Sequence, residues 1–185
     1  MPDRFLRMSR FHGVIRRFSS NRRGSAAIEF ALIAPPFFAL IFAIIETAMV
    51  FFAGQVLETG TQDSARMLFT NQAQSQSWNQ AAFQSDLCKR VSVLLDCSKL
   101  YTDVQSYASG TPANLSNPIN AQGQFVSTGF SYSPPAANST NIVVVRTYYQ
   151  WPLFVTGLGY SLANIGSSTK LLAATAAFRV EPNGS

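Results

Sequence analysis

The chain has 185 residues, 47% of them hydrophobic and 12% charged, and its formal net charge at pH 7 is +5. This length suits one modest domain with a membrane or targeting segment, and it excludes two large cores. The positive charge does not indicate nucleic-acid binding: residues 1–24 contribute +6 through seven arginines and one aspartate, and the rest of the chain carries −1. The body therefore lacks a basic surface for phosphates.

A long apolar segment follows the basic leader of residues 1–24. Residues 30–53 include a single charged side chain, Glu46, and as a helix they extend about 36 Å, enough to cross a hydrocarbon core of about 30 Å. Seven arginines precede the segment and only Arg66 follows soon after it, so the positive-inside rule places the N-terminus in the cytoplasm. A transmembrane helix is predicted over residues 25–54. The alternative is a cleaved secretory signal, whose apolar region is usually shorter.

The junction between leader and apolar segment has a specific pattern. Two arginines precede Gly24, four small or apolar residues follow it, and then come Glu29 and Phe30. This stretch resembles the processing site of type IV pilins. As a whole, residues 23–35 are closer to the TadE-like minor pilins or pseudopilins of the tight-adherence (Flp, type IVb) pilus system. Further similarity to that family is found at residues 45–47, 63–66, 149–152 and 178–182.

The resemblance implies how this junction is used. A prepilin peptidase cuts after Gly24, so that Ser25 becomes the first mature residue, and Glu29 at the fifth position pairs with the amino group of a neighbouring subunit. The implied partners are the bacterial inner membrane, other major and minor pilins and the assembly platform, with residues 55–185 as an exported, periplasmic pilin-like domain. No cofactor is implied. Alternatively, Glu29 only lies among lipid headgroups, where a carboxylate costs little.

Two further features interrupt the apolar segment. Glu46 lies 16 residues after Phe30, and an ionisable group within a membrane is a functional candidate by default. It is expected either to contact the assembly platform or another pilin helix, or to lie close enough to the outer interface to reach water. Pro35 and Pro36 remove hydrogen bonds from the helix, so we expect a kink in the first half of the span.

Helical periodicity continues beyond the membrane segment. Small and apolar side chains recur at helical spacing over residues 55–70, which predicts an amphipathic stalk. A second helix is predicted over residues 77–95, starting at a capping box formed by Ser77 and Gln80. Its apolar face consists of Phe83, Leu87, Val91 and Leu94.

The two cysteines, Cys88 and Cys97, are predicted to form a disulfide, because a pair of thiols in an oxidising compartment favours one. Nine helical residues would hold their Cα atoms about 13 Å apart, whereas a disulfide requires less than about 7 Å. The helix should therefore end near Leu95, with Cys97 folding back. The alternative is a metal site with two thiolates, which lacks the further ligands that zinc requires.

Alternating and β-branched runs predict an antiparallel sheet within residues 100–181. The region of residues 171–177 is alanine-rich and could be helical instead, whereas Ile142–Val145 is apolar on both faces and suits a central strand. Polar residues, Pro and Gly predict loops over residues 111–123 and 133–141. The expected fold class is α+β, with a long N-terminal helix, a second helix and a small sheet, as in pilins. The predicted strands are residues 100–107, 124–132, 142–151 and 171–180.

Catalytic motifs are not evident in the exported part. The one histidine, His12, lies in the leader, and the exported acids form no evident pair, which argues against a catalytic triad, a zinc site or a glycosidase. The aromatic residues near the end of the third predicted strand suit a binding surface for sugars or another pilin, but strand alternation favours the core for half of them. They are Tyr148, Tyr149, Trp151 and Phe154.

These observations predict a minor pilin or pseudopilin that acts in pilus assembly, initiation and adhesion, and not an enzyme. The alternative is an uncleaved, membrane-anchored periplasmic binding or envelope domain. A periplasmic hydrolase would require a pair of carboxylates that converge in one cleft of the folded domain.

Overall fold

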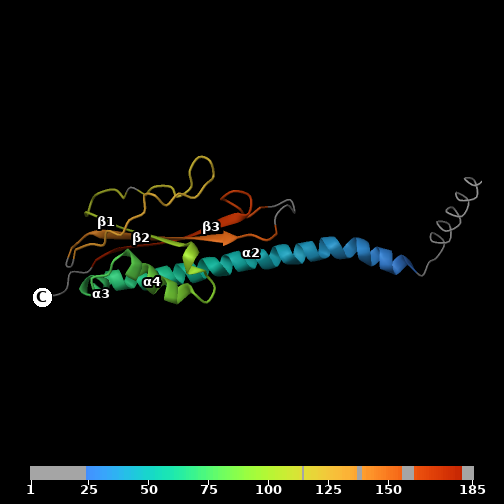
Figure 1. Ribbon diagram of the computed structural model, residues 1–185, viewed down its shortest axis with the longest axis horizontal. Helices are drawn as coiled ribbons and strands as arrows, with labels where there is room; N and C mark the ends of the chain where they lie inside the picture. The colour runs from blue at the N-terminus through green and yellow to red at the C-terminus, as the bar shows by residue number, and fades with distance from the viewer. Residues whose placement is uncertain (1–23, 114, 137–138, 156–160, 181–185) are drawn as a thin grey trace, which may run out of the picture. The chain divides into compact units, whose positions relative to one another are not determined.

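The computed structural model describes residues 24–113, 115–136, 139–155 and 161–180. Its contacts divide the chain into two compact units, Met1–Ile44 and Ile45–Ser185, and each is described by itself. The described elements are three helices, a short 3-10 helix and three strands (Figure 1). The long apolar helix and the small antiparallel sheet confirm the predicted α+β class.

The first unit contains the N-terminal part of helix α2, which runs from Ser25 to Phe69. The helix continues without interruption through Pro35 and Pro36. A proline in a helix has no N–H to donate, and its ring pushes away the carbonyl four residues earlier. The loss is limited to these local hydrogen bonds, so the helix can continue. The kink at these prolines stays a prediction.

In the second unit α2 is amphipathic. Apolar and small side chains face the domain, and Glu58, Asp63 and Arg66 are exposed, as the periodicity predicted. Asn71 then adopts a left-handed conformation with a φ of 58°, which turns the chain into the short helix α3, Gln72–Ser75. The buried positions of this part of α2 include Ala53, Leu57, Thr61, Ser64, Ala65 and Leu68.

Helix α4, Gln80–Val91, is shorter than predicted at both ends. Its N-cap is Asn79, whose Oδ1 accepts the N–H of Ala82 at 2.9 Å, so the predicted capping box at Ser77 is wrong. Ser77 has a φ of 52° and its N–H donates to Gln74 in the turn after α3, which prevents it from starting the helix. The apolar face is confirmed: Phe83, Leu87 and Val91 are buried, and Leu94 lies beyond the helix.

The sheet has the strand order β1-β2-β3 and is antiparallel throughout. Its strands are β1, Leu100–Tyr107, β2, Ile142–Pro152, and β3, Thr169–Arg179. The central position of Ile142–Val145 is confirmed, and Val145 pairs with Val104 on one side and Ala176 on the other. The alanine-rich segment is a strand and not a helix, because it completes this pairing with β2.

The strand predicted over residues 124–132 is wrong. It is reduced to isolated bridges, of which Val104–Tyr132 lies on the outer edge of β1. The N–H of Val104 donates to Ser131 at 2.8 Å, and the N–H of Ser133 donates to Val104 at 2.7 Å. The next two residues are prolines, which have no N–H to continue a ladder.

Helices α2 and α4 cover one face of the sheet through two apolar clusters (Figure 1). One cluster joins Leu57 and Leu87 to Leu100 and Tyr149, and the other joins Leu68 and Phe83 to β-sheet valines. Amide side chains of α4 also bind the free edge of β1: Gln84 donates to the carbonyl of Leu100 at 2.8 Å. The core therefore fixes α2, α4 and the sheet to one another within this unit.

Candidate functional site

The predicted processing junction lies at the start of α2. Gly24 is the first described residue, and the helix begins at Ser25. The side chains of Ile28, Glu29 and Phe30 are exposed, that of Phe30 to 69%. A Cβ atom added to Gly24 would meet no atom within 4 Å. The described residues thus leave the junction uncovered, and the basic leader before it lies outside them.

Large apolar side chains are exposed along the part of α2 that belongs to the first unit. An apolar surface of this kind is stable in lipid or against another apolar helix, and it is costly in water. The helix is long and apolar enough to cross a membrane. The exposed residues include Leu32, Ile33, Phe37, Phe38, Leu40, Phe42 and Ile44.

Glu46 is bound within its own domain. Its side chain is 7% exposed, and Oε1 accepts the backbone N–H groups of Phe154 and Val155, the latter at 3.0 Å. Hydrogen bonds from two amides offset much of the cost of removing a carboxylate from water. The sequence identified Glu46 but neither expectation for it anticipated this intramolecular partner. Its role in assembly stays a prediction.

A polar network joins α2 to α4. The hydroxyl of Ser64 donates to Asp86 at 2.9 Å, and Arg90 Nε donates to the same carboxylate at 2.9 Å. Arg90 also lies 3.6 Å from Asp63. Asp63 and Asp86 therefore both contact the guanidinium of Arg90, and the contact with Asp63 is a salt bridge between α2 and α4. Apart from helical spacing, no sequence pattern predicted this network.

Gly60 lies where α4 crosses closest to α2. An added Cβ would lie 2.5 Å from Cγ1 of Val91, so this position requires glycine for packing. The following residue, Thr61, donates to the carbonyl of Leu57 at 2.7 Å and lies 2.5 Å from the hydroxyl oxygen of Thr147. Together these contacts set the separation of the helices and the sheet.

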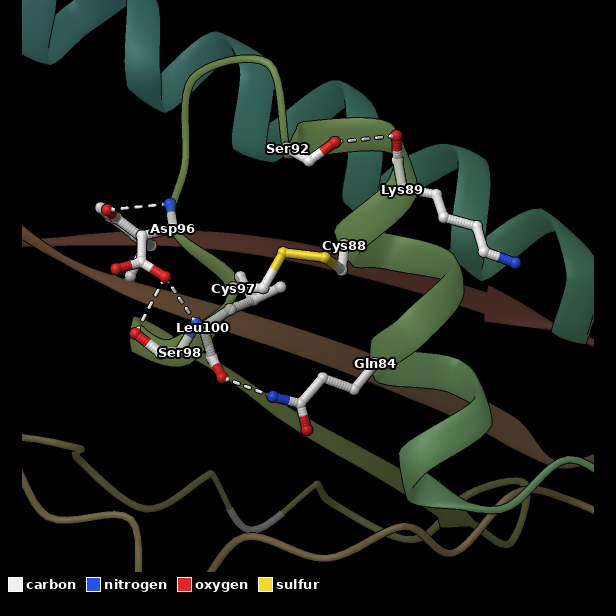
Figure 2. The surroundings of a disulfide bond; sticks show 9 residues. Gln84, Cys88, Lys89, Ser92, Asp96, Cys97, Ser98 and Leu100 are labelled. Atoms are coloured by element: carbon white, nitrogen blue, oxygen red, sulfur yellow. Dashed lines mark hydrogen bonds between the residues drawn. A yellow bond between two sulfur atoms is a disulfide. The ribbon is translucent and has the colours of Figure 1, made fainter.

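The predicted disulfide between Cys88 and Cys97 is confirmed, with Cα atoms 5.6 Å apart. Figure 2 shows that it joins α4 to the turn before β1. Asp96 caps this turn: its Oδ1 accepts the N–H of Ser98 at 3.0 Å and the Ser98 hydroxyl at 2.9 Å. The backbone N–H of Ser98 is the main cause of a lowered pKa for Asp96, and the Ser98 hydroxyl adds to it.

A buried ion pair lies on the sheet face opposite the helices. Arg146 of β2 binds Asp103 of β1 through Nη2 at 2.6 Å, and both side chains are almost completely buried. Arg146 also donates to the carbonyl of Ser116 at 2.8 Å, and Asp103 accepts the N–H of Ser131 at 3.0 Å. The pair therefore holds the long connection between β1 and β2 against the sheet.

Of the four aromatic residues considered as a binding surface, Tyr148 and Tyr149 are buried and Trp151 is half-buried. Tyr148 stacks on Phe130 with ring centroids 5.1 Å apart, a contact that strand alternation alone did not reveal. Phe154 is 83% exposed. Half of the four residues are therefore buried, as strand alternation predicted, and Phe154 is not part of the core.

Among the described residues, no group of three or more His, Cys, Asp or Glu side chains is placed to hold a metal ion. The sequence model of the family described as TadE-like protein matches residues 24–66. This match covers the junction, the apolar helix and most of its amphipathic part, and it confirms the resemblance found in the sequence. No curated protein and no solved structure matches the chain.

Proposed function

Because residues 24–66 match TadE-like proteins, we propose that the chain is a minor pilin or pseudopilin of a tight-adherence pilus. In this proposal it enters the bacterial inner membrane with its N-terminus in the cytoplasm and is processed after Gly24 by a prepilin peptidase. It then acts in pilus assembly, initiation and adhesion through α2. The observation that carries the proposal is a helix that starts directly after Gly24 and exposes its apolar surface.

Among the described residues, packing does not account for glycine at position 24. An added Cβ would meet no atom within 4 Å. Gly60 shows the contrast, because there a Cβ would collide with Val91. Gly54 also has no neighbour within 4 Å, but Gly24 stands at the junction with the apolar helix. There the absence of a side chain supports a requirement from outside the chain, such as the active site of a peptidase.

The position of Glu29 also supports the proposal. It lies four residues after Ser25, one turn into α2, where the partial positive charge of a helix N-terminus favours a carboxylate. Cutting before Ser25 would create an ammonium group at this end of the helix. Glu29 then offers a negative charge to the ammonium group of a neighbouring subunit, in an apolar environment where such pairs are strong.

The N-terminus of the membrane-extracted protein tests processing. The full chain is expressed with and without a prepilin peptidase, and intact mass and N-terminal sequencing should find Ser25 first only with the enzyme. Gly24→Leu should abolish processing. Gly54→Leu is the matched control, because a Cβ at Gly54 also meets no atom within 4 Å. Met1 as the N-terminus in the presence of the peptidase would instead support the uncleaved anchor.

A further inference from the structure

The turn of α2 at Glu46 marks a change in what surrounds the helix. The amide groups of Phe154 and Val155 bind Glu46, so the chain just after β2 is held at this turn. From here on, one side of α2 packs on the domain: Val50 and Ala53 are buried in the same cluster as Leu153. That side of the helix is covered by protein and is not available to lipid.

The part of α2 before Glu46 is long enough to cross a membrane alone. Residues 25–44 of the helix rise about 30 Å at 1.5 Å per residue, which equals the thickness of a typical hydrocarbon core. The predicted span of residues 25–54 is therefore longer than the membrane requires. Its last third is the part that contacts the domain.

The other side of α2 at this level is apolar. Phe51 is 70% and Phe52 58% exposed, and no charged residue occurs between Glu46 and Glu58. Residues 46–53 rise about 10 Å, whereas the headgroup region of each leaflet is about 5–8 Å thick. With the hydrocarbon ending at Glu46, Phe51 and Phe52 lie toward the outer boundary of the headgroup layer.

Phe154 adds an aromatic side chain from the β2–β3 connection. It is 83% exposed, and its own N–H donates to Glu46, so its backbone is held at the level of that carboxylate. Within this unit, Ile45 and Met49 are also exposed. We define the basal surface as Ile45, Met49, Phe51, Phe52 and Phe154.

We propose that the basal surface lies in the headgroup layer of the membrane that α2 crosses, with Phe154 inserted at the boundary of the hydrocarbon. The partner is a phospholipid bilayer, and the hydrocarbon ends at about Glu46 instead of residue 54. The basal surface continues directly from the apolar helix, and no charged residue occurs between Glu46 and Glu58. Both features favour lipid over a second protein as the partner. The inference rests on the membrane insertion of the proposed function, but not on processing at Gly24.

Site-specific fluorescence in phospholipid nanodiscs tests whether the basal surface lies in the headgroup layer. Phe154→Cys in the full chain is labelled with an environment-sensitive dye without reductant, so that the native disulfide remains. Val93→Cys is the matched control, because Val93 is an apolar residue 95% exposed in the turn after α4. We expect a blue-shifted emission at position 154, quenched several-fold more strongly by lipids with a nitroxide near the headgroup than the emission at position 93.

Two outcomes would overturn the proposal. One is water-like emission at position 154 with quenching equal to that at position 93. The other is a blue-shifted emission that lipid nitroxides do not quench, which would mean that protein covers this surface. Phe52→Cys is a second reporter if Phe154→Cys does not fold, and it should also be quenched from the headgroup level. N-terminal sequencing of the same samples separates this result from a failure of processing, because the proposal requires the same quenching with or without the leader.

Discussion

Thr61 of α2 and Thr147 of β2 bring their hydroxyl oxygens within 2.5 Å of each other, and both residues are fully buried. Since the one hydroxyl proton of Thr61 is donated to the carbonyl of Leu57, Thr147 is the donor in the contact between them. This single polar contact lies between two apolar clusters. It therefore fixes the register between the helix and the central strand.

Removing this hydroxyl should destabilise the domain. We expect Thr147→Ala to lower the free energy of unfolding by about 1–3 kcal/mol, because it leaves a small cavity and removes the hydrogen bond that Thr147 donates to Thr61. Thr147→Ser retains the donor and should cost clearly less. Urea unfolding of the full chain in detergent, followed by circular dichroism, measures both. If Thr61→Ala and Thr147→Ala were strictly additive in the double variant, the two hydroxyl groups would not interact.

The crossing of α2 and α4 should not tolerate a side chain at Gly60. Gly60→Ala places a methyl group 2.5 Å from Val91, so we expect a loss of about 1–3 kcal/mol in stability. Gly54→Ala provides the control and should be neutral or stabilise by up to about 1 kcal/mol, because alanine favours helix and meets no neighbour there. Val91→Ala should recover part of the loss in Gly60→Ala. Equal thermal midpoints for the two glycine variants would contradict this account.

The disulfide should stabilise the turn between α4 and β1. For a loop of about ten residues, the chain-entropy treatment gives a contribution of about 2.5–3 kcal/mol. A double variant, Cys88→Ala with Cys97→Ala, should therefore lose about this amount of unfolding free energy. The reductant dithiothreitol should shift the unfolding midpoint of the wild type toward that of the variant and should leave the variant unchanged. If dithiothreitol also shifted the unfolding midpoint of the double variant, the shift would not be caused by reduction of this disulfide.

Alkaline pH should weaken the packing of Tyr132 against Phe83. Burial raises the pKa of Tyr132 from 10.0 to about 12, so the folded state keeps the phenol neutral where the unfolded state ionises. Stability is thus unaffected below about pH 10 and falls as the pH rises from 10 to 12. Urea unfolding across this range should show a smaller decline for Tyr132→Phe. In an absorbance titration of the folded protein, Tyr132→Phe should show one tyrosine fewer that ionises only at high pH than the wild type shows.

Structural elements that depend on residues close together in the chain were largely predictable from the sequence. The bounds of β1 are the predicted ones and β2 extends one residue further, because β-branched and aromatic residues recur along both strands. The disulfide followed from the presence of only two cysteines. The failed strand over residues 124–132 shows the limit, since its residues suit a strand but the prolines after Tyr132 end the pairing.

The amino-acid sequence alone was enough to predict that an apolar helix follows an arginine-rich leader, that Gly24 and Glu29 stand at their junction, and that a small sheet follows. Composition and spacing carry this information, because hydrophobicity and charge act residue by residue. The folded structure was needed to find that Glu46 binds the amides of Phe154 and Val155 and that Arg146 binds Asp103. The physical reason is that these contacts join positions far apart in the chain, and one of them uses backbone N–H groups, which every residue except proline carries.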